Sequence, residues 1–147
     1  EYEIGGVFIT GIQTNGSGKK ESIVPRNTLY VFDYDGLTVV HLGDIDRVPT
    51  QTEVEALGSV HVARVPVGGG GSLNASKAAE IISLLEPNLV IPMHYAISGT
   101  KASLEPLGKF LKEMGMKDAE HVPSLKVGGV SSLPEETHVT VLEYTPH

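Results

Sequence analysis

Two residues, Asp44 and His94, combine the side-chain types and the sequence setting of divalent-metal ligands. Each closely follows an apolar stretch typical of a strand, Leu37–Leu42 for Asp44 and Leu89–Met93 for His94. A carboxylate and an imidazole fixed at strand ends are donors from which a zinc or similar divalent site is built. Each residue also has a structural interpretation, because a strand-end aspartate often caps a turn and a single histidine is more often satisfied within the fold.

A catalytic zinc site takes three protein ligands and a water, and Asp44 with His94 makes two. His41 is the histidine closest in sequence to Asp44. Residues three apart in a strand point to opposite faces, so we expect His41 to pack or to support the site rather than to bind metal. The remaining histidines have no partner pattern and are expected to be surface or satisfied residues: His61, His121, His138 and His147.

The glycine run Gly68–Gly71 lies between a strand-like and a helix-like segment, where a phosphate-binding loop would lie. The dinucleotide motif G-x-G-x-x-G and the P-loop both require a further glycine at Leu73 or Asn74, and neither position has one. We therefore interpret the glycines as a turn that leads into a helix with its N-cap at Ser72 or Asn74. A Rossmann-like nucleotide-binding domain is disfavoured.

The elements that position these residues alternate between strand and helix patterns. The predicted strands lie at Gly6–Ile12, Asn27–Tyr34, Leu37–Leu42, Val60–Val67, Leu89–Met93 and Thr137–Tyr144. The predicted helices begin at the capping box of Thr50 and Glu53 and end at Gly58, span Asn74–Glu86, and follow Leu104, Leu107, Leu111 and Met114 up to Gly115. Asp35-Gly36 predicts a hairpin turn. This order predicts an α/β chain with a mixed sheet and helices packed on it.

The composition excludes several classes of protein. A length of 147 residues with 40% hydrophobic and 20% charged residues indicates one globular domain. No apolar run approaches the ~20 residues of a membrane-spanning helix, so we expect no membrane partner. The absence of cysteine excludes disulfides and thiolate metal sites. It is also compatible with the cytoplasm, where we expect the protein to be.

The charge balance argues against nucleic acid as the partner. The net charge is −7, from 18 acidic and 11 basic residues, whereas binding a phosphate backbone requires a clustered basic surface. Aromatic residues make up 5% and tryptophan is absent, so a base-stacking platform is not expected. If the protein acts on a substrate, a small molecule fits this composition better.

Several ordered motifs carry a family resemblance: His-Leu-Gly-Asp at 41–44, Val-Pro-Val-Gly-Gly at 65–69, the helix at 74–86, and Pro-Asn-Leu-Val-Ile-Pro-Met-His-Tyr at 87–95. Together they resemble the metallo-β-lactamase superfamily, and most closely its small branch of predicted metal-dependent hydrolases. The resemblance covers nearly the whole chain. It implies an αββα sandwich of two mixed sheets flanked by helices, with one or two metal ions at the sheet edges.

The same resemblance implies roles for the two candidate ligands. Asp44 matches the aspartate that contacts or bridges the metals, and His94 matches the late histidine ligand. Zinc or another divalent metal is therefore the implied cofactor. Such a metal activates a water that attacks an ester, amide or phosphoester.

The chain also departs from the family pattern. The His-x-His-x-Asp-His motif, which supplies most of the metal ligands, is absent, and in the family it would precede residue 1. We therefore expect residues 1–147 to form a single, partial domain, the C-terminal portion of the sandwich. The early loop has Asn15 and no histidine, Arg47 stands where the branch often has a histidine, and Arg64 stands at a position expected to be buried.

Two functional hypotheses follow. The first is a metal-dependent hydrolase, inactive as the isolated chain and completed by a missing N-terminal segment or a partner chain. The alternative is a non-catalytic binding or scaffold relative that has lost the metals, which Asn15, Arg47 and Arg64 favour. An incomplete sandwich exposes an apolar sheet face and open strand edges. We therefore expect a homo-oligomer, in the simplest case a homodimer, or pairing with the missing segment.

Overall fold

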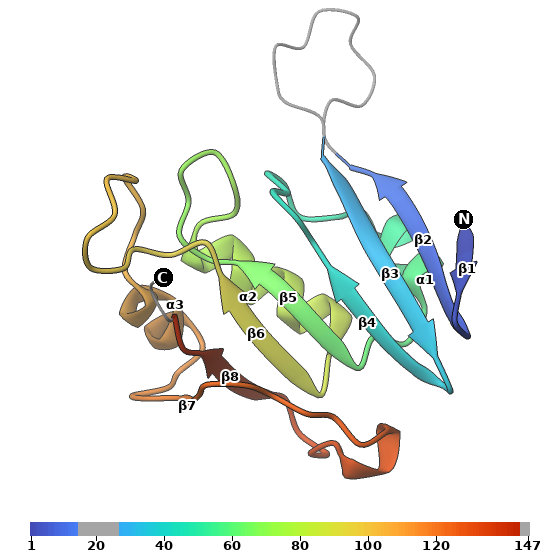
Figure 1. Ribbon diagram of the computed structural model, residues 1–147. Coiled ribbons are helices and arrows are strands. Elements are labelled where there is room, and N and C mark those ends of the chain that lie inside the picture. The colour runs from blue at the N-terminus through green and yellow to red at the C-terminus, as the bar shows by residue number, and fades with distance from the viewer. Residues whose placement is uncertain (15–26, 145–147) are drawn as a thin grey trace, which may run out of the picture.

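The computed structural model describes residues 1–14 and 27–144, which form a mixed sheet with helices packed against it (Figure 1). The strands of the sheet are β1 (Tyr2–Ile4), β2 (Val7–Gln13), β3 (Thr28–Tyr34), β4 (Leu37–His41), β5 (Val62–Pro66), β6 (Leu89–Met93), β7 (Glu120–Val122) and β8 (His138–Leu142). The helices are α1 (Gln51–Leu57), α2 (Ala75–Leu85) and α3 (Leu107–Glu113), with a short 3₁₀ turn, η1, at Val130–Ser132. The early loop with Asn15 lies outside the described residues, as does His147.

The strands form an eight-stranded sheet in the order β1-β2-β3-β4-β5-β6-β8-β7. The first four strands pair antiparallel as a meander, whereas β4, β5, β6, β8 and β7 run parallel. The carboxyl ends of β4, β5 and β6 consequently meet at one edge of the sheet. Functional side chains in such sheets lie in the loops beyond this edge.

The hairpin between β3 and β4 forms where the sequence predicts it. Asp35 and Gly36 both have positive φ, 48° and 81°, and Tyr34 pairs with Leu37 across the turn. Positive φ at both central residues is the two-residue turn whose twist matches that of the flanking strands. The hairpin thereby fixes the register of β4, which leads to Asp44.

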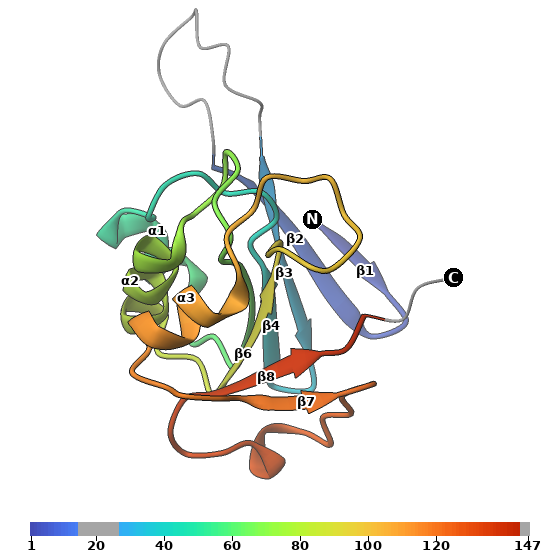
Figure 2. The same ribbon diagram turned by 90° about the vertical axis from the view of Figure 1, so that its left-hand side faces the viewer.

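The three helices of the described part of the chain lie on the same side of the sheet (Figure 2). The capping box of Thr50 and Glu53 is present at the start of α1, and Gly58 ends that helix, both as predicted. Asn74 caps α2, its side chain accepting a hydrogen bond from the Lys77 N–H. Local capping chemistry therefore sets where these two helices begin.

Two sequence-based expectations about the last third of the chain need correction. The helix predicted from Leu104 begins only at Leu107, because Pro106 lies at its N-cap in extended backbone and proline disfavours helix in the residue before it. The predicted strand Thr137–Tyr144 is the shorter β8, His138–Leu142, which lies between β6 and β7. Strand β7 has only three residues and no clear alternation, which explains why the sequence pattern misses it.

The main hydrophobic core lies between the helices and the sheet. Fully buried side chains from both layers form it, among them Val40, Ala63, Val65, Val90, Ala78, Ile81 and Phe110. A second, smaller cluster on the opposite face contains Val62, Leu89 and Ile91 and is partly covered by the segment around Leu125, Val127 and Leu133. Strands β5 and β6 thus bury both faces, which explains their continuous apolar sequences. Within the described residues, no helix has the length and apolarity needed to cross a membrane.

Candidate metal centre

The structure brings together the two residues that the sequence singles out. His94 Nε2 lies 3.9 Å from Asp44 Oδ1, and their side chains are 40% and 68% exposed. Asp44 follows β4 and His94 follows β6, so both stand at the carboxyl edge of the parallel strands. An imidazole and a carboxylate therefore meet where solvent reaches both of them.

The backbone that carries Asp44 is hydrogen-bonded at each successive amide. The Leu42 N–H donates to the Arg64 carbonyl oxygen at 3.1 Å, and the Gly43 N–H donates to His41 Nδ1 at 3.0 Å. The Asp44 N–H donates to Asn27 Oδ1 at 2.8 Å. The turn that presents Asp44 is therefore held by contacts with the chain around it.

His94 is held in an uncommon backbone conformation. Its φ is +57°, in the left-handed region where residues other than glycine pay about 1–2 kcal/mol. The chain approaches it so closely that a Cβ on Gly68 would lie 2.2 Å from the His94 carbonyl oxygen. Strained residues of this kind cluster at functional sites, where the surrounding structure holds them.

The glycine run forms the strand-to-helix turn that the sequence predicts, and it borders the site. The Leu73 N–H donates to the Ile45 carbonyl oxygen at 3.0 Å, which joins this turn to the Asp44 loop. A Cβ on Gly70 would lie 3.7 Å from His94 Nε2. The Ser72 hydroxyl donates to Asp44 Oδ1. The sequence does not reveal this contact, because it identifies Ser72 only as a candidate N-cap.

The other histidines among the described residues lie as the sequence predicts, packed within the fold or on its surface. Burial, and then the nearby Arg64 guanidinium, lower the pKa of His41, whose Nδ1 accepts the Gly43 N–H. His61 Nδ1 accepts the Thr38 N–H at 2.9 Å. On the surface, His121 lies 3.9 Å from Asp118 and His138 lies 3.1 Å from Glu120.

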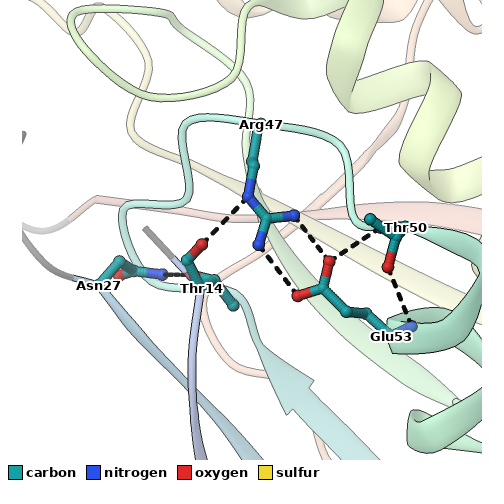
Figure 3. A network of polar contacts seen from close by, with 5 residues as sticks. All are labelled: Thr14, Asn27, Arg47, Thr50 and Glu53. Atoms are coloured by element: carbon teal, nitrogen blue, oxygen red, sulfur yellow. Dashed lines mark hydrogen bonds and ion pairs between the residues drawn. The ribbon is translucent and has the colours of Figure 1, made fainter. Parts of the chain in front are cut away.

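The two arginines that depart from the family pattern differ in role. Arg47 donates to both carboxylate oxygens of Glu53, at 2.7 and 3.0 Å, and its Nε donates to the Thr14 carbonyl oxygen (Figure 3). These hydrogen bonds, followed by one from the Thr50 backbone, lower the pKa of Glu53 to about 2. Arg47 thus anchors α1, whereas the Nε of Arg64 is buried on the sheet with no hydrogen-bond partner among the described residues.

The donor set fits part of a metal site. Metal–nitrogen and metal–oxygen bonds of ~2.1 Å allow two atoms 3.9 Å apart to contact one ion. Among residues 1–14 and 27–144, however, no three histidine, aspartate or glutamate side chains form a group that could hold a metal. The described residues therefore provide two ligand positions and not the three that a catalytic zinc requires.

Comparison with known proteins identifies the family. A family model described as the β-lactamase superfamily domain matches residues 1–94. The chain belongs to this superfamily. A solved superfamily structure from Thermotoga maritima, described as a candidate Zn-dependent hydrolase of the metallo-β-lactamase superfamily, is 34% identical with a TM-score of 0.80. The alignment covers 96% of this chain and 67% of that one, which confirms the predicted α/β fold with a mixed sheet and flanking helices.

Curated members of the superfamily are longer than this chain. A UPF0173 protein of Pyrococcus furiosus is 38% identical over 76 residues, which are 52% of this chain and 33% of that protein. The UPF0173 metal-dependent hydrolase of Pyrococcus horikoshii is 33% identical over 96 residues, 63% of this chain and 42% of the relative. The aligned part of this chain therefore covers less than half the length of these relatives. The YhfI protein of Bacillus subtilis, 12% identical with a TM-score of 0.58 over 95% of this chain and 48% of its own, shows the fold alone.

Proposed function

We propose that this chain supplies part of the metal site of a metal-dependent hydrolase, with Asp44 and His94 as two of its ligands. The observation that carries the proposal is the 3.9 Å distance between His94 Nε2 and Asp44 Oδ1 at the carboxyl edge of the parallel strands. The names of the Pyrococcus abyssi and Pyrococcus horikoshii relatives, both metal-dependent hydrolases, support the same activity.

The chemistry follows from the proposed ligands. A divalent metal, which we propose to be zinc, lowers the pKa of a bound water toward ~7 and stabilises charge that develops on an ester, amide or phosphoester. The Ser72 hydroxyl orients the Asp44 carboxylate by donating to Oδ1. The glycine turn packs closely against this site, because a Cβ on Gly70 would lie 2.6 Å from Leu104 Cδ2 and 3.7 Å from His94 Nε2. The net charge of −7 supports a small-molecule substrate over nucleic acid.

The remaining ligands lie, in this proposal, outside the described residues. The described residues form no group of three metal-binding side chains, and the aligned part of the chain covers less than half of its curated relatives. We propose that an N-terminal segment or a partner chain supplies them. Such a segment would reach the carboxyl edge of the sheet from the face opposite the helices.

That face is uncovered only in part, because the segment around Leu125 and Leu133 packs on Ile91 while Tyr30 on β3 stays exposed. Cross-strand partners share a face of a sheet, so the register places Tyr30, His41, Arg64 and Ile91 in one row across β3 to β6. Tyr30 is 45% exposed, and Arg64 Nε is buried without a partner among the described residues. Because a buried cation is costly unless it is paired, a carboxylate on the covering layer fits this position.

In the absence of a covering segment, we propose that the same face mediates the homodimer. Sedimentation velocity of the 147-residue chain tests this, with a dimer expected at micromolar concentration. Replacing Tyr30 with glutamate should dissociate it, because a charge would be buried in the interface. A monomer at all concentrations contradicts the dimer. The cytoplasmic location is likewise proposed and is tested by fractionation of cells that express the protein.

The alternative function is a binding or scaffold module that retains the fold without metals. The lack of a third ligand among the described residues favours it. This alternative predicts that His94 does not bind added metal, whereas the hydrolase proposal predicts that it does.

A zinc titration followed by NMR separates the two functions. The ring signals of His94 should shift first and saturably, because its Nε2 and Asp44 Oδ1 are arranged to share an ion. His121 is the matched control, since its Nε2 is also 3.9 Å from an aspartate oxygen. No shift at His94, or equal shifts at His94 and His121, would mean that Asp44 and His94 form no metal site in this chain by itself, and would favour the binding module.

A further inference from the structure

Asn27 is a buried polar residue that directly contacts the loop of the proposed metal ligand Asp44. Only 7% of its surface is exposed, and it immediately precedes β3. A buried side-chain amide is costly unless its hydrogen-bonding groups are satisfied. Its partners therefore show what the residue is held in place to do.

Both ends of the Asn27 amide are engaged, which fixes its orientation. Oδ1 accepts the Asp44 N–H at 2.8 Å. Nδ2 donates to the Leu42 carbonyl oxygen and to the Thr14 hydroxyl, each at 2.9 Å. An amide rotated by half a turn would place its oxygen against the Leu42 carbonyl oxygen and its nitrogen against the Asp44 N–H, so only one orientation satisfies all three contacts.

The Asn27 side chain forms hydrogen bonds with the Asp44 loop at two points. It binds the carbonyl before Gly43 and the amide after it, and Gly43 has a φ of +64°. A Cβ on Gly43 would lie 2.5 Å from Asn27 Oδ1, so only glycine permits the approach. Asn27 thereby holds both ends of the turn from which Asp44 projects.

Thr14 connects this contact to α1. The Thr14 hydroxyl accepts from Asn27, and the Thr14 carbonyl oxygen accepts from Arg47 Nε at 3.1 Å (Figure 3). Arg47 in turn holds Glu53, whose carboxylate accepts the Thr50 N–H of the capping box. Asn27 is therefore supported from the side away from Asp44 by a continuous polar network.

We propose that Asn27 is the positioning residue of Asp44, and that it sets the affinity of the metal site by holding the Asp44 turn. The proposed effect on metal rests on the function proposed above. Partners that orient metal ligands typically change affinity 10–100-fold when they are removed. The hydrogen bond from Asp44 N–H to Asn27 Oδ1 does not depend on metal, so it is tested separately.

The variant that tests the positioning role is Asn27→Ala, with Asn88→Ala as the matched control. Asn88 Nδ2 also donates to a backbone carbonyl, that of Pro134, at 2.9 Å, but it does not contact the Asp44 loop. Calorimetric zinc titration of the 147-residue chain should show a loss of about 10-fold or more in Asn27→Ala and less than about 2-fold in Asn88→Ala. In an Asp44→Asn background, Asn27→Ala should cause no further loss, because it acts through Asp44.

The second readout is hydrogen exchange of the Asp44 amide, which requires no metal. Asn27→Ala should accelerate this exchange selectively, because it removes the acceptor. A folded Asn27→Ala protein with unchanged zinc affinity, or with a full loss in the Asp44→Asn background, overturns the positioning role. If wild-type protein binds no zinc at His94, the proposed function fails. If the Asp44 amide also exchanges at the same rate in Asn27→Ala as in wild type, the positioning role is overturned as well.

If Asn27→Ala does not fold, two measurements on the wild-type protein test the positioning role of Asn27. The Asp44 amide must exchange more slowly than exposed loop amides, and the Asn27 side-chain signals must shift with those of His94 during zinc titration. A rapidly exchanging Asp44 amide, or Asn27 signals that do not respond while His94 shifts, would overturn the inference.

Discussion

The structure contains two histidine–aspartate pairs with the same separation and different surroundings. His94 Nε2 lies 3.9 Å from Asp44 Oδ1, and His121 Nε2 lies 3.9 Å from Asp118 Oδ1. The first pair joins two strand ends that are distant in sequence, and both backbones are held by contacts from other elements. The second pair is three residues apart, and Asp118 accepts the N–H of the residue after it. Distance alone does not make a ligand pair, because a metal site also requires side chains that are held for it.

The largest expected effect comes from the backbone beneath His94, which has no counterpart at His121. Gly68→Ala should destabilise the protein by ~3 kcal/mol, because the new Cβ would lie 2.2 Å from the His94 carbonyl oxygen and neither backbone can easily retreat. Urea denaturation measures the change. Gly108→Ala is the control, since a Cβ there meets nothing within 4 Å and alanine favours the helix. Equal stability of the two variants would mean that His94 is not tightly held.

The second largest effect is an expected difference in zinc affinity between substitutions of Asp44 and of Asp118. Asp44→Asn should weaken zinc binding about 10-fold or more, because an amide oxygen replaces a charged ligand of the proposed site. Asp118→Asn should change the affinity less than about 2-fold, although its distance to a histidine is the same. Isothermal titration calorimetry measures both. Equal losses would show that zinc binds surface pairs indiscriminately.

A smaller effect on stability is expected from the salt bridge between Arg47 and Glu53. This pair belongs to the polar network that supports Asn27 and, through it, the Asp44 loop. Arg47→Met should cost about 1 kcal/mol, because the pair with Glu53 is only partly buried. The pKa of Glu53 in the folded protein is lowered to about 2. The ionised carboxylate therefore contributes its full stabilisation of the fold above the pKa of an unfolded glutamate, and this stabilisation is lost as the pH falls toward 2. Acid titrations of unfolding should therefore show a weaker pH dependence between about pH 4.5 and 2 in Arg47→Met than in wild type. Identical acid profiles would contradict the pKa shift.

The predictions that succeeded from sequence rest on local chemistry. Asp35-Gly36 determines its turn through φ alone, and Thr50 with Glu53 caps its helix within four residues. The nearness of Asp44 and His94 was also predictable, because parallel strands bring their carboxyl ends to one edge.

The rest depends on contacts between distant segments. Asn27 lies opposite Asp44 where the β3–β4 register continues past the strands, but its neighbouring sequence does not indicate that its buried side chain accepts the Asp44 N–H. Ser72 contacts Asp44 only because the glycine turn folds back toward β4. Strand β7 pairs only with β8 and has no clear pattern of its own. In each case tertiary packing, rather than local propensity, fixes the role of the residue.

The left-handed backbone of His94 has a consequence for protein engineering. Glycine adopts a φ of +57° without the steric cost that a histidine pays, so His94→Gly should favour folding by about 1 kcal/mol at this position. A screen for thermostability alone would therefore select against the imidazole. If His94 is the metal ligand proposed above, selection for stability and selection for function act in opposite directions at this residue. A substitution that raises the melting temperature while it removes a side chain would mark such a position in related chains of unassigned function.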